Sequence, residues 1–185
     1  MIKKRYYVAF LILLCLGFSM KYMNKYHIDN DYATIQSSLK DELNRGSVDK
    51  LNPKLIETVR LGESSSYIAL FQLENNEIGY SQMIKGLNGK FKFERAGHGT
   101  NIVSYEDIHT NKGNYGILVG HNPGQKINHI SAKLINEEFE FNADVSSDRI
   151  FVKDEKLPSN LKEIFPAELT FYDENNRVIH AADLM

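Results

Sequence analysis

Histidine offers the widest range of chemistry among the side chains of this sequence, because a neutral imidazole can bind a metal ion or move a proton near pH 7. Four of the six histidines fall within 32 residues, namely His98, His109, His121 and His129. No two of them have the close spacing of a metal-binding motif, and the single cysteine, Cys15, is distant in the sequence. The pattern therefore favours loop and strand-end histidines over a metal site.

Serine and carboxylate chemistry has no sharper signal. Ser64-Ser65-Ser66 is a polar stretch without the Gly-x-Ser-x-Gly elbow that exposes a nucleophile. Glu137, Glu138 and Glu140 surround a predicted hairpin turn, where carboxylates are usually solvated. A triad assembled from distant parts of the chain and a carboxylate pair for glycoside hydrolysis stay open as alternatives, because their geometry is set in space.

The glycine-rich segment 96–100, Ala-Gly-His-Gly-Thr, could bring backbone close to a phosphate. It lacks the lysine and the helix that follow a phosphate-binding loop, so its glycines indicate tight backbone geometry instead. We therefore predict no catalytic, metal-ligating or cofactor-binding residue and no cofactor.

Arg95 is in an unexpected place. Phe91 and Phe93 alternate with charged side chains, as in a strand with one buried face, and this alternation puts Arg95 on the apolar side. A guanidinium there needs a carboxylate partner or an exit to solvent. We predict that Arg95 lies at the strand end and emerges at the sheet edge, with a contact to an anion or a partner as the alternative.

An apolar N-terminal segment precedes all of these residues. Tyr6–Met20 contains only tyrosine and serine as polar side chains and follows three cations at positions 3–5. Fifteen helical residues span about 22 Å, and Lys21–Met23 would lengthen the helix toward a membrane-spanning length. We predict an uncleaved transmembrane signal anchor through residues 6–23. The balance of flanking cations predicts a single-pass protein of the cell membrane, with a cytoplasmic N-terminus and an extracytoplasmic C-terminal domain.

Three alternatives to the anchor stay open. A cleaved signal peptide would need small residues at a cleavage site, which Phe18–Met23 does not supply. A lipoprotein signal would use Cys15, but Leu14 stands where a small residue is expected. A buried helix would not usually combine leading cations with a run that is apolar all round.

The remaining chain reads as one helix followed by strands. Tyr32, Ile35, Leu39 and Leu43 recur at helical spacing behind a capping Asp31, which predicts a helix with one apolar stripe lying against a sheet. Later segments change to a period of two. Candidate strands are 55–61, 67–73, 78–85, a strand around 91–93, 102–108, 115–119, 127–134, 138–145, 149–153, 168–172 and 177–181.

Short turns between these segments predict antiparallel neighbours. Asn88-Gly89 fits a type I′ hairpin, and Asn122-Pro123-Gly124 fits a type II turn. We therefore predict an α+β fold: a single N-terminal transmembrane helix (1–25), one helix packed on an antiparallel sheet (26–112), and a small immunoglobulin-like β-sandwich subdomain (113–185).

The charge distribution bears on partners. Residues 1–25 hold five of the 22 basic side chains and no acid, which leaves 17 basic against 24 acidic side chains, or about −7, for the rest. This balance argues against nucleic acid as a partner, since phosphate binding needs clustered cations. An envelope protein or a cell-wall component is the expected partner.

Segments 84–97 and 171–176 resemble small membrane-anchored extracytoplasmic proteins of spore-forming Gram-positive bacteria. That group has no assigned activity, so the resemblance implies export and a β-rich fold only. The sequence favours a non-catalytic binding or interaction module at the cell envelope, with an envelope hydrolase that lacks a visible motif as the alternative.

Overall fold

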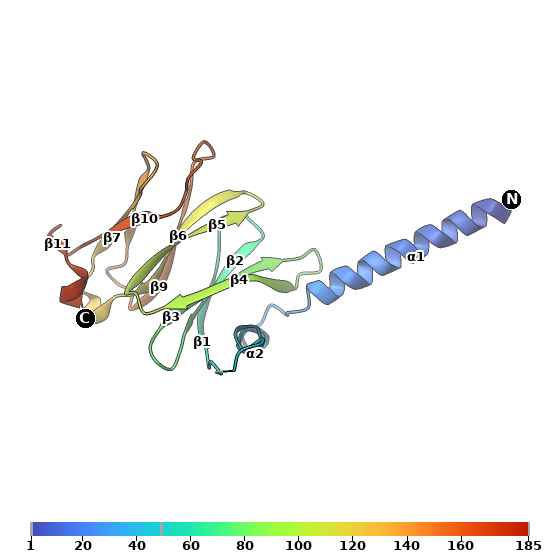
Figure 1. Cartoon of the computed structure of the whole chain (residues 1–185), viewed down its shortest axis with the longest axis horizontal. Helices are drawn as coiled ribbons and strands as arrows, with labels where there is room; N and C mark the ends of the chain where they lie inside the picture. The colour runs from blue at the N-terminus through green and yellow to red at the C-terminus, as the bar shows by residue number, and fades with distance from the viewer. Residues whose placement is uncertain (1, 49, 185) are drawn as a thin grey trace.

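The computed structural model describes residues 2–48 and 50–184, in which two α-helices precede eleven β-strands (Figure 1). The strands form three antiparallel sheets that stack face to face. The first sheet has the order β1 (Lys54–Arg60), β2 (Ser66–Gln72), β3 (Ile78–Lys85) and β4 (Phe91–Gly99). The middle sheet has the order β5 (Val103–Thr110), β6 (Gly113–His121) and β9 (Ile150–Lys156). The third sheet has the order β11 (Val178–Ile179), β10 (Ala167–Tyr172), β7 (His129–Leu134) and β8 (Glu140–Asp144).

β6 runs through the centre of the body. Ile117 and Val119 pack toward the first sheet, whereas Leu118 between them packs toward the third. A strand that is buried on both faces carries a continuous apolar run instead of an alternation. This explains the Tyr-Gly-Ile-Leu-Val sequence of residues 115–119, and Gly116 is small because a Cβ there would lie 2.7 Å from the Tyr105 ring.

Helix α2 (Tyr32–Leu43) covers the outer face of the first sheet, as its apolar stripe predicts. The Asp31 carboxylate accepts a hydrogen bond from the Thr34 backbone N–H at 2.9 Å and so caps the first turn. Ile35 and Leu39 are buried against the sheet. Each such side chain contributes roughly 1.5–3 kcal/mol through burial, which fixes the helix on this face.

The predicted α+β class with a separate immunoglobulin-like sandwich is wrong, because the fold is mostly β and its strands form three sheets. β6 and β9 belong to the middle sheet together with β5, and the other strands after residue 112 form the third sheet. Turn spacing is the same in a two-sheet sandwich and in stacked sheets, so it cannot reveal which strands pair. The domain limits at residues 25 and 112 stay a prediction, and residue 112 lies in the turn between β5 and β6.

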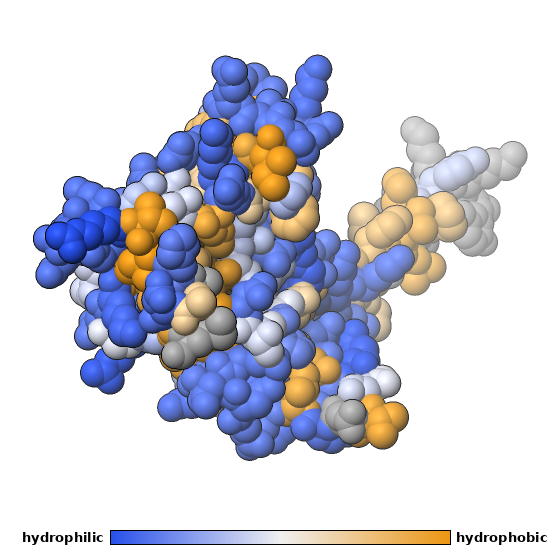
Figure 2. Space-filling model, turned by 60° about the vertical axis from the view of Figure 1, so that its left-hand side comes forward, coloured by the Kyte–Doolittle hydropathy of each residue, from blue (hydrophilic) through white to orange (hydrophobic). Residues whose placement is uncertain are grey.

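Helix α1 (Ile2–Lys25) projects from the body (Figure 1). Figure 2 shows its apolar side chains standing apart from a surface that is mostly hydrophilic, and Phe10, Leu13 and Phe18 are 60%, 68% and 71% exposed. Within residues 2–48 and 50–184, no helix combines the length and the apolar character needed to cross a membrane. The predicted transmembrane anchor, and with it the single-pass cell-membrane location, is therefore wrong. Its apolar run of fifteen residues spans about 22 Å, which is less than the ~30 Å thickness of the hydrocarbon core. The helix then continues through Lys21 to Lys25.

The last turn of α1 is attached to the β3–β4 hairpin. The Tyr22 hydroxyl accepts a hydrogen bond from the Leu87 backbone N–H at 2.5 Å, and the Asn88 side-chain amide donates to the Tyr26 carbonyl at 2.9 Å. Tyr22 and Tyr26 stack with their ring centroids 4.6 Å apart, and a Cβ on Gly86 would lie 2.7 Å from both the Tyr22 hydroxyl oxygen and the Tyr26 ring. The helix and the hairpin therefore meet in a close contact.

Two turns can be compared with the turn types predicted from the sequence. Gly89 has φ 79°, but Asn88 does not have a positive φ, so the predicted type I′ turn at Asn88-Gly89 is wrong. The Gly89 N–H bonds to Gly86 O and the Gly86 N–H bonds to Lys90 O, which is the three-residue hairpin loop with glycine in the left-handed region. Gly124 has φ 63°, as a type II turn requires at that place.

Candidate functional site

One opening lies where the first and middle sheets end together. It has a volume of about 500 Å³, and we call it the β6–β9 cleft. Residues from the β2–β3 hairpin form one side, and the end of β6, the loop after it and the start of β9 form the other. The lining consists of Gln72, Asn76, His121, Asn122, Pro123, Gly124, Gln125, Arg149 and Ile150.

Asn122 builds the frame of this cleft. It is buried, with 2% of its surface exposed, and its side-chain amide donates to the carbonyls of Ile127 and Val145 at 2.7 and 3.0 Å. Its side-chain oxygen accepts from the Ile127 N–H at 2.9 Å, and its own N–H donates to Arg149 O at 2.8 Å. Every polar group of Asn122 that faces the protein is thereby paired, which fixes the loop over residues 122–127.

The loop that follows turns sharply outward. Pro123–Gln125 (η1) lies in the type II turn described above, closed by the hydrogen bond from Gln125 N–H to Asn122 O, and Gly124 and Gln125 both have positive φ values, 63° and 54°. Gln125 adopts this unusual backbone region while its side-chain amide donates to Ser147 O at 3.1 Å. The turn places one more amide side chain at the opening of the cleft.

Two cleft side chains have hydrogen-bonding atoms that the protein leaves unused. The Nδ1 atom of His121 is shielded from solvent and has no hydrogen-bond partner. Arg149 is exposed, and its guanidinium makes no hydrogen bond or ion pair with the described residues. Partial burial lowers the pKa of His121, so the imidazole is neutral at pH 7. An unpaired shielded nitrogen costs free energy.

The charge of the cleft contrasts with the rest of the chain. Arg149 is the sole charged side chain among its nine lining residues, and the other polar side chains are amides and His121. The chain as a whole has more acids than bases, 24 against 22. The cleft is therefore locally positive in an acidic body, and amide groups can both donate and accept hydrogen bonds within it.

Arg95 belongs to a second polar region, and its placement corrects the sequence prediction. Strand β4 carries a bulge in which Glu94 is the extra residue. A bulge interrupts the alternation of a strand, so Phe91 and Phe93 pack toward α2 whereas Arg95 turns toward the middle sheet. The prediction that Arg95 shares a face with the two phenylalanines, at the strand end, is wrong. The residue does lie on an edge strand, with 37% of its side chain exposed.

A carboxylate partner for Arg95 is present in the middle sheet. The Tyr80 hydroxyl donates to Glu106 Oε2 at 2.8 Å, and Arg95 Nη2 lies 3.5 Å from the same oxygen. Arg95 Nη2 also donates to the Asp107 carbonyl, and the guanidinium carbon lies 5.7 Å from the Tyr80 ring centre. Burial, and then the hydrogen bond to Glu106, raises the pKa of Tyr80, so its hydroxyl stays protonated. These three side chains, the Tyr80 cluster, bind one another, and the adjoining hollow measures only about 90 Å³.

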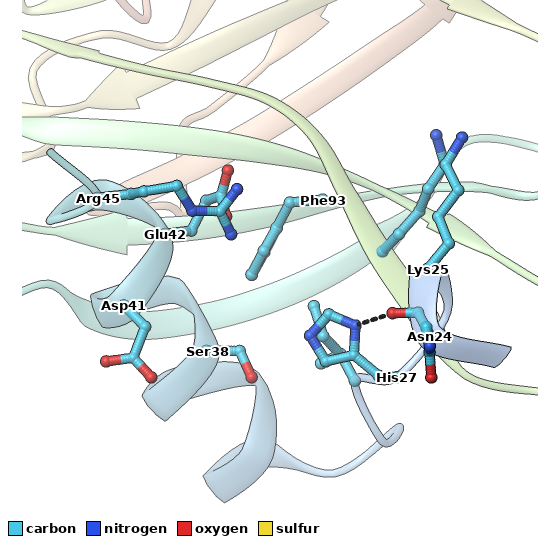
Figure 3. A pocket seen from close by; sticks show the side chains of 10 residues that line it. Asn24, Lys25, His27, Ser38, Asp41, Glu42, Arg45 and Phe93 are labelled. Atoms are coloured by element: carbon cyan, nitrogen blue, oxygen red, sulfur yellow. Dashed lines mark hydrogen bonds and ion pairs between the residues drawn. The ribbon is translucent and has the colours of Figure 1, made fainter. Parts of the chain in front are cut away.

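Figure 3 shows a third opening, of about 260 Å³, between the end of α1, the exposed face of α2 and β4. Arg45 and Glu42 form an ion pair of 2.6 Å at one side of it, and His27 Nδ1 lies 3.1 Å from Asn24 O at the other. Asp41 points away from the centre. Three cations, Lys25, Arg45 and Lys92, and two carboxylates, Asp41 and Glu42, line this opening, so charges of both signs are interspersed here, with one cation in excess.

The other residues considered from the sequence lie apart from one another. His98 Nδ1 is 2.7 Å from Glu77 Oε2, His109 Nδ1 is 2.8 Å from Asn114 Oδ1, and the His129 ring stacks on Tyr172. Within the described part of the chain, no group of three or more histidine, cysteine or acidic side chains could hold a metal ion.

The serines and glutamates serve local structure. Ser64 Oγ accepts from the Ser66 N–H at 3.0 Å inside a buried turn, Glu137 accepts from two backbone N–H groups, and Glu140 accepts from Ser131 Oγ. Sequence reasoning named His121 but missed Arg149, Gln72, Asn76 and Gln125. The signal that could have found them is the Asn-Pro-Gly turn directly after a strand buried on both faces, because that turn must open at a sheet end.

Comparison with protein family models, with curated proteins and with solved structures gives no match to this chain. The function of the chain must therefore be inferred from the geometry of the β6–β9 cleft.

Proposed function

We propose that this chain is a non-catalytic binding module whose ligand occupies the β6–β9 cleft. The observation that carries the proposal is the exposed Arg149 guanidinium, which no described residue pairs with, beside amide side chains in an opening of about 500 Å³. A volume of this size suits a small polar molecule. A positive charge that the protein leaves unpaired at an opening can pair with an anionic group of a ligand.

The chemistry of the lining supports binding over catalysis. None of the nine lining residues supplies a hydroxyl, a thiol or a carboxylate. A hydroxyl, thiol or carboxylate nucleophile is thus lacking among these nine residues, and His121 is the one side chain there that could act as a nucleophile or a general base. The alternative is a hydrolase whose residues assemble in three dimensions, and it has less support. The Tyr80 cluster contains a tyrosine whose pKa is raised, but its three side chains bind one another instead of facing a cleft.

Nuclear magnetic resonance of the full chain tests the proposal. The protein is titrated separately with N-acetylalanine, N-acetylalaninamide, inorganic phosphate and N-acetylglucosamine, and backbone amide shifts are followed. We expect at least one compound to shift the backbone amides of His121, Asn122, Gly124 and Gln125 saturably, with little change at residues 80, 95 and 106. If all four compounds leave residues 121–125 unchanged at tens of millimolar, or shift only sites outside the cleft, the proposal is contradicted.

A further inference from the structure

Resting on the proposed function, we infer that the β6–β9 cleft selects a monocarboxylate whose carboxyl group stands next to an amide. This names the chemical class of the ligand from the groups that line the cleft. The carboxylate would pair with Arg149, and the neighbouring amide would bond to the side chains of Gln72, Asn76 and Gln125.

Charge selects an anion with a single negative charge. Arg149 supplies one positive charge, and no second lysine or arginine lines the cleft. His121 is neutral at pH 7 because burial lowers its pKa, so it adds no charge. A dianion would leave one charge uncompensated, whereas a monocarboxylate is neutralised.

Geometry favours the carboxylate in a second way. A guanidinium presents two parallel N–H groups that match the two oxygens of a carboxylate, and this paired contact is stronger than one between neutral groups. The Arg149 guanidinium is free for such a contact because no acid in the described chain holds it, and the nearby Asp148 pairs with Lys153 at 2.8 Å instead.

The amide side chains determine what stands beside the carboxylate. Gln72, Asn76 and Gln125 come from the two opposite sides of the cleft, and each carries one acceptor and two donor hydrogens. Part of this capacity is used inside the protein, since Gln72 Nε2 donates to Asn76 Oδ1 at 3.4 Å and Gln125 Nε2 donates to Ser147 O. The remaining Gln125 and Gln72 oxygens and the Asn76 amine complement the N–H and C=O of one amide unit.

The same carboxylate–amide chemistry occurs in free N-acyl amino acids and at the C-terminus of a peptide. The test therefore uses N-acetylalanine and N-acetyl-trialanine with a free carboxylate, together with N-acetylalaninamide and inorganic phosphate as the neutral and the tetrahedral-anion comparisons. Affinity is measured at pH 7 on the full chain from the backbone amide shifts of His121, Asn122, Gly124 and Gln125. We expect either carboxylate to bind at least tenfold more tightly than the neutral amide or phosphate. The tighter of the two carboxylates identifies the source.

Three variants make the result specific. Arg149→Gln should weaken carboxylate binding about tenfold or more, and Arg149→Lys should fall between, because it keeps the charge and loses the paired contact. The matched control is Arg177→Gln, an exposed arginine in the turn before β11 that makes the same charge change outside the cleft, and it should not alter affinity.

Several outcomes would overturn the inference while leaving the proposed function intact: equal binding of the neutral amide, preferential binding of phosphate or N-acetylglucosamine in the cleft, or equal effects of Arg149→Gln and Arg177→Gln. Absence of any saturable shift at residues 121–125 with every compound would instead contradict the proposed function itself.

Discussion

The Tyr80 cluster and the β6–β9 cleft both lie where the first and middle sheets meet, and their arginines are held differently. In the cluster, one Glu106 oxygen serves both Tyr80 and Arg95, although Arg95 Nε is buried without a hydrogen-bond partner. In the cleft, the Arg149 side chain is exposed, and no described residue pairs with its guanidinium. A charged group that its neighbours hold stabilises the fold, whereas one that faces solvent is available to a ligand. The chemical type of the residue does not distinguish the two roles, since each region contains an arginine.

The largest expected effect is the loss of stability when Asn122, which holds the loop over residues 122–127, is replaced. Asn122→Ala should lower the free energy of unfolding by about 3 kcal/mol or more, because it leaves Ile127 N–H and two buried carbonyls without partners. Urea denaturation followed by circular dichroism measures the change. The control is Asn142→Ala on β8, an exposed asparagine, which should change stability by less than about 0.5 kcal/mol. Similar values for the two variants would show that Asn122 does not hold the loop.

The next effect contrasts the two regions directly. Glu106→Ala should cost about 1–2 kcal/mol of unfolding free energy, because Tyr80 and Arg95 lose their shared acceptor. Arg149→Gln should stay within about 0.5 kcal/mol, because the guanidinium has no partner to lose among the residues that the structure describes. Both are measured by urea denaturation, with the exposed Glu57→Ala as a control for loss of a carboxylate. A larger cost for Arg149→Gln than for Glu106→Ala would reverse the comparison.

A smaller effect sharpens the description of the cluster. Tyr80→Phe removes one hydroxyl and keeps the ring beneath Arg95, so it should lower the free energy of unfolding by about 1 kcal/mol. Combined with Glu106→Ala, it should add little, because the acceptor is already gone. The double-mutant cycle provides the measurement, and full additivity would show that the hydroxyl and the carboxylate do not interact.

The smallest effect concerns pH. Burial lowers the pKa of His121 in the folded state, so the unfolded chain binds a proton more readily, and this contribution to stability is complete above about pH 6.5. It is lost as the pH falls from 6.5 toward the lower folded pKa. His121→Gln should therefore show a shallower loss of unfolding free energy between pH 7 and pH 5 than the unmodified protein. His180→Gln, at an exposed position, should follow the unmodified protein, and an identical slope for His121→Gln would contradict the assignment.

Local patterns predicted the elements better than their assembly. The helix behind Asp31 and the antiparallel strands follow from periodicity and capping, which are properties of neighbouring residues. The stacking of three sheets depends on which strands pair, and turn spacing does not determine that. Residues 115–119 contained a usable clue, because their continuous apolar run requires burial on both faces and hence a sheet on each side.

The polar regions were harder to predict for a related reason. One extra residue, Glu94, reverses the side of the sheet on which Arg95 lies, and no turn residue marks it in the sequence. Arg149 and Gln72 are far apart in the chain and become neighbours only because two sheet ends meet. The transmembrane prediction relied on the apolar run Tyr6–Met20 and reached a membrane-spanning length only by counting Lys21–Met23 as part of the span.

The junction of α1 with the β3–β4 hairpin has a mechanical consequence. Beyond the Tyr22 and Tyr26 contacts, the Ile28 backbone pairs with Phe91 in both directions and Asp29 forms an ion pair with Lys90 at 2.9 Å. Several contacts of different kinds therefore span the few residues between the helix and β4. A force that rotates the protruding helix would therefore act directly on β4 and the β3–β4 hairpin of the first sheet.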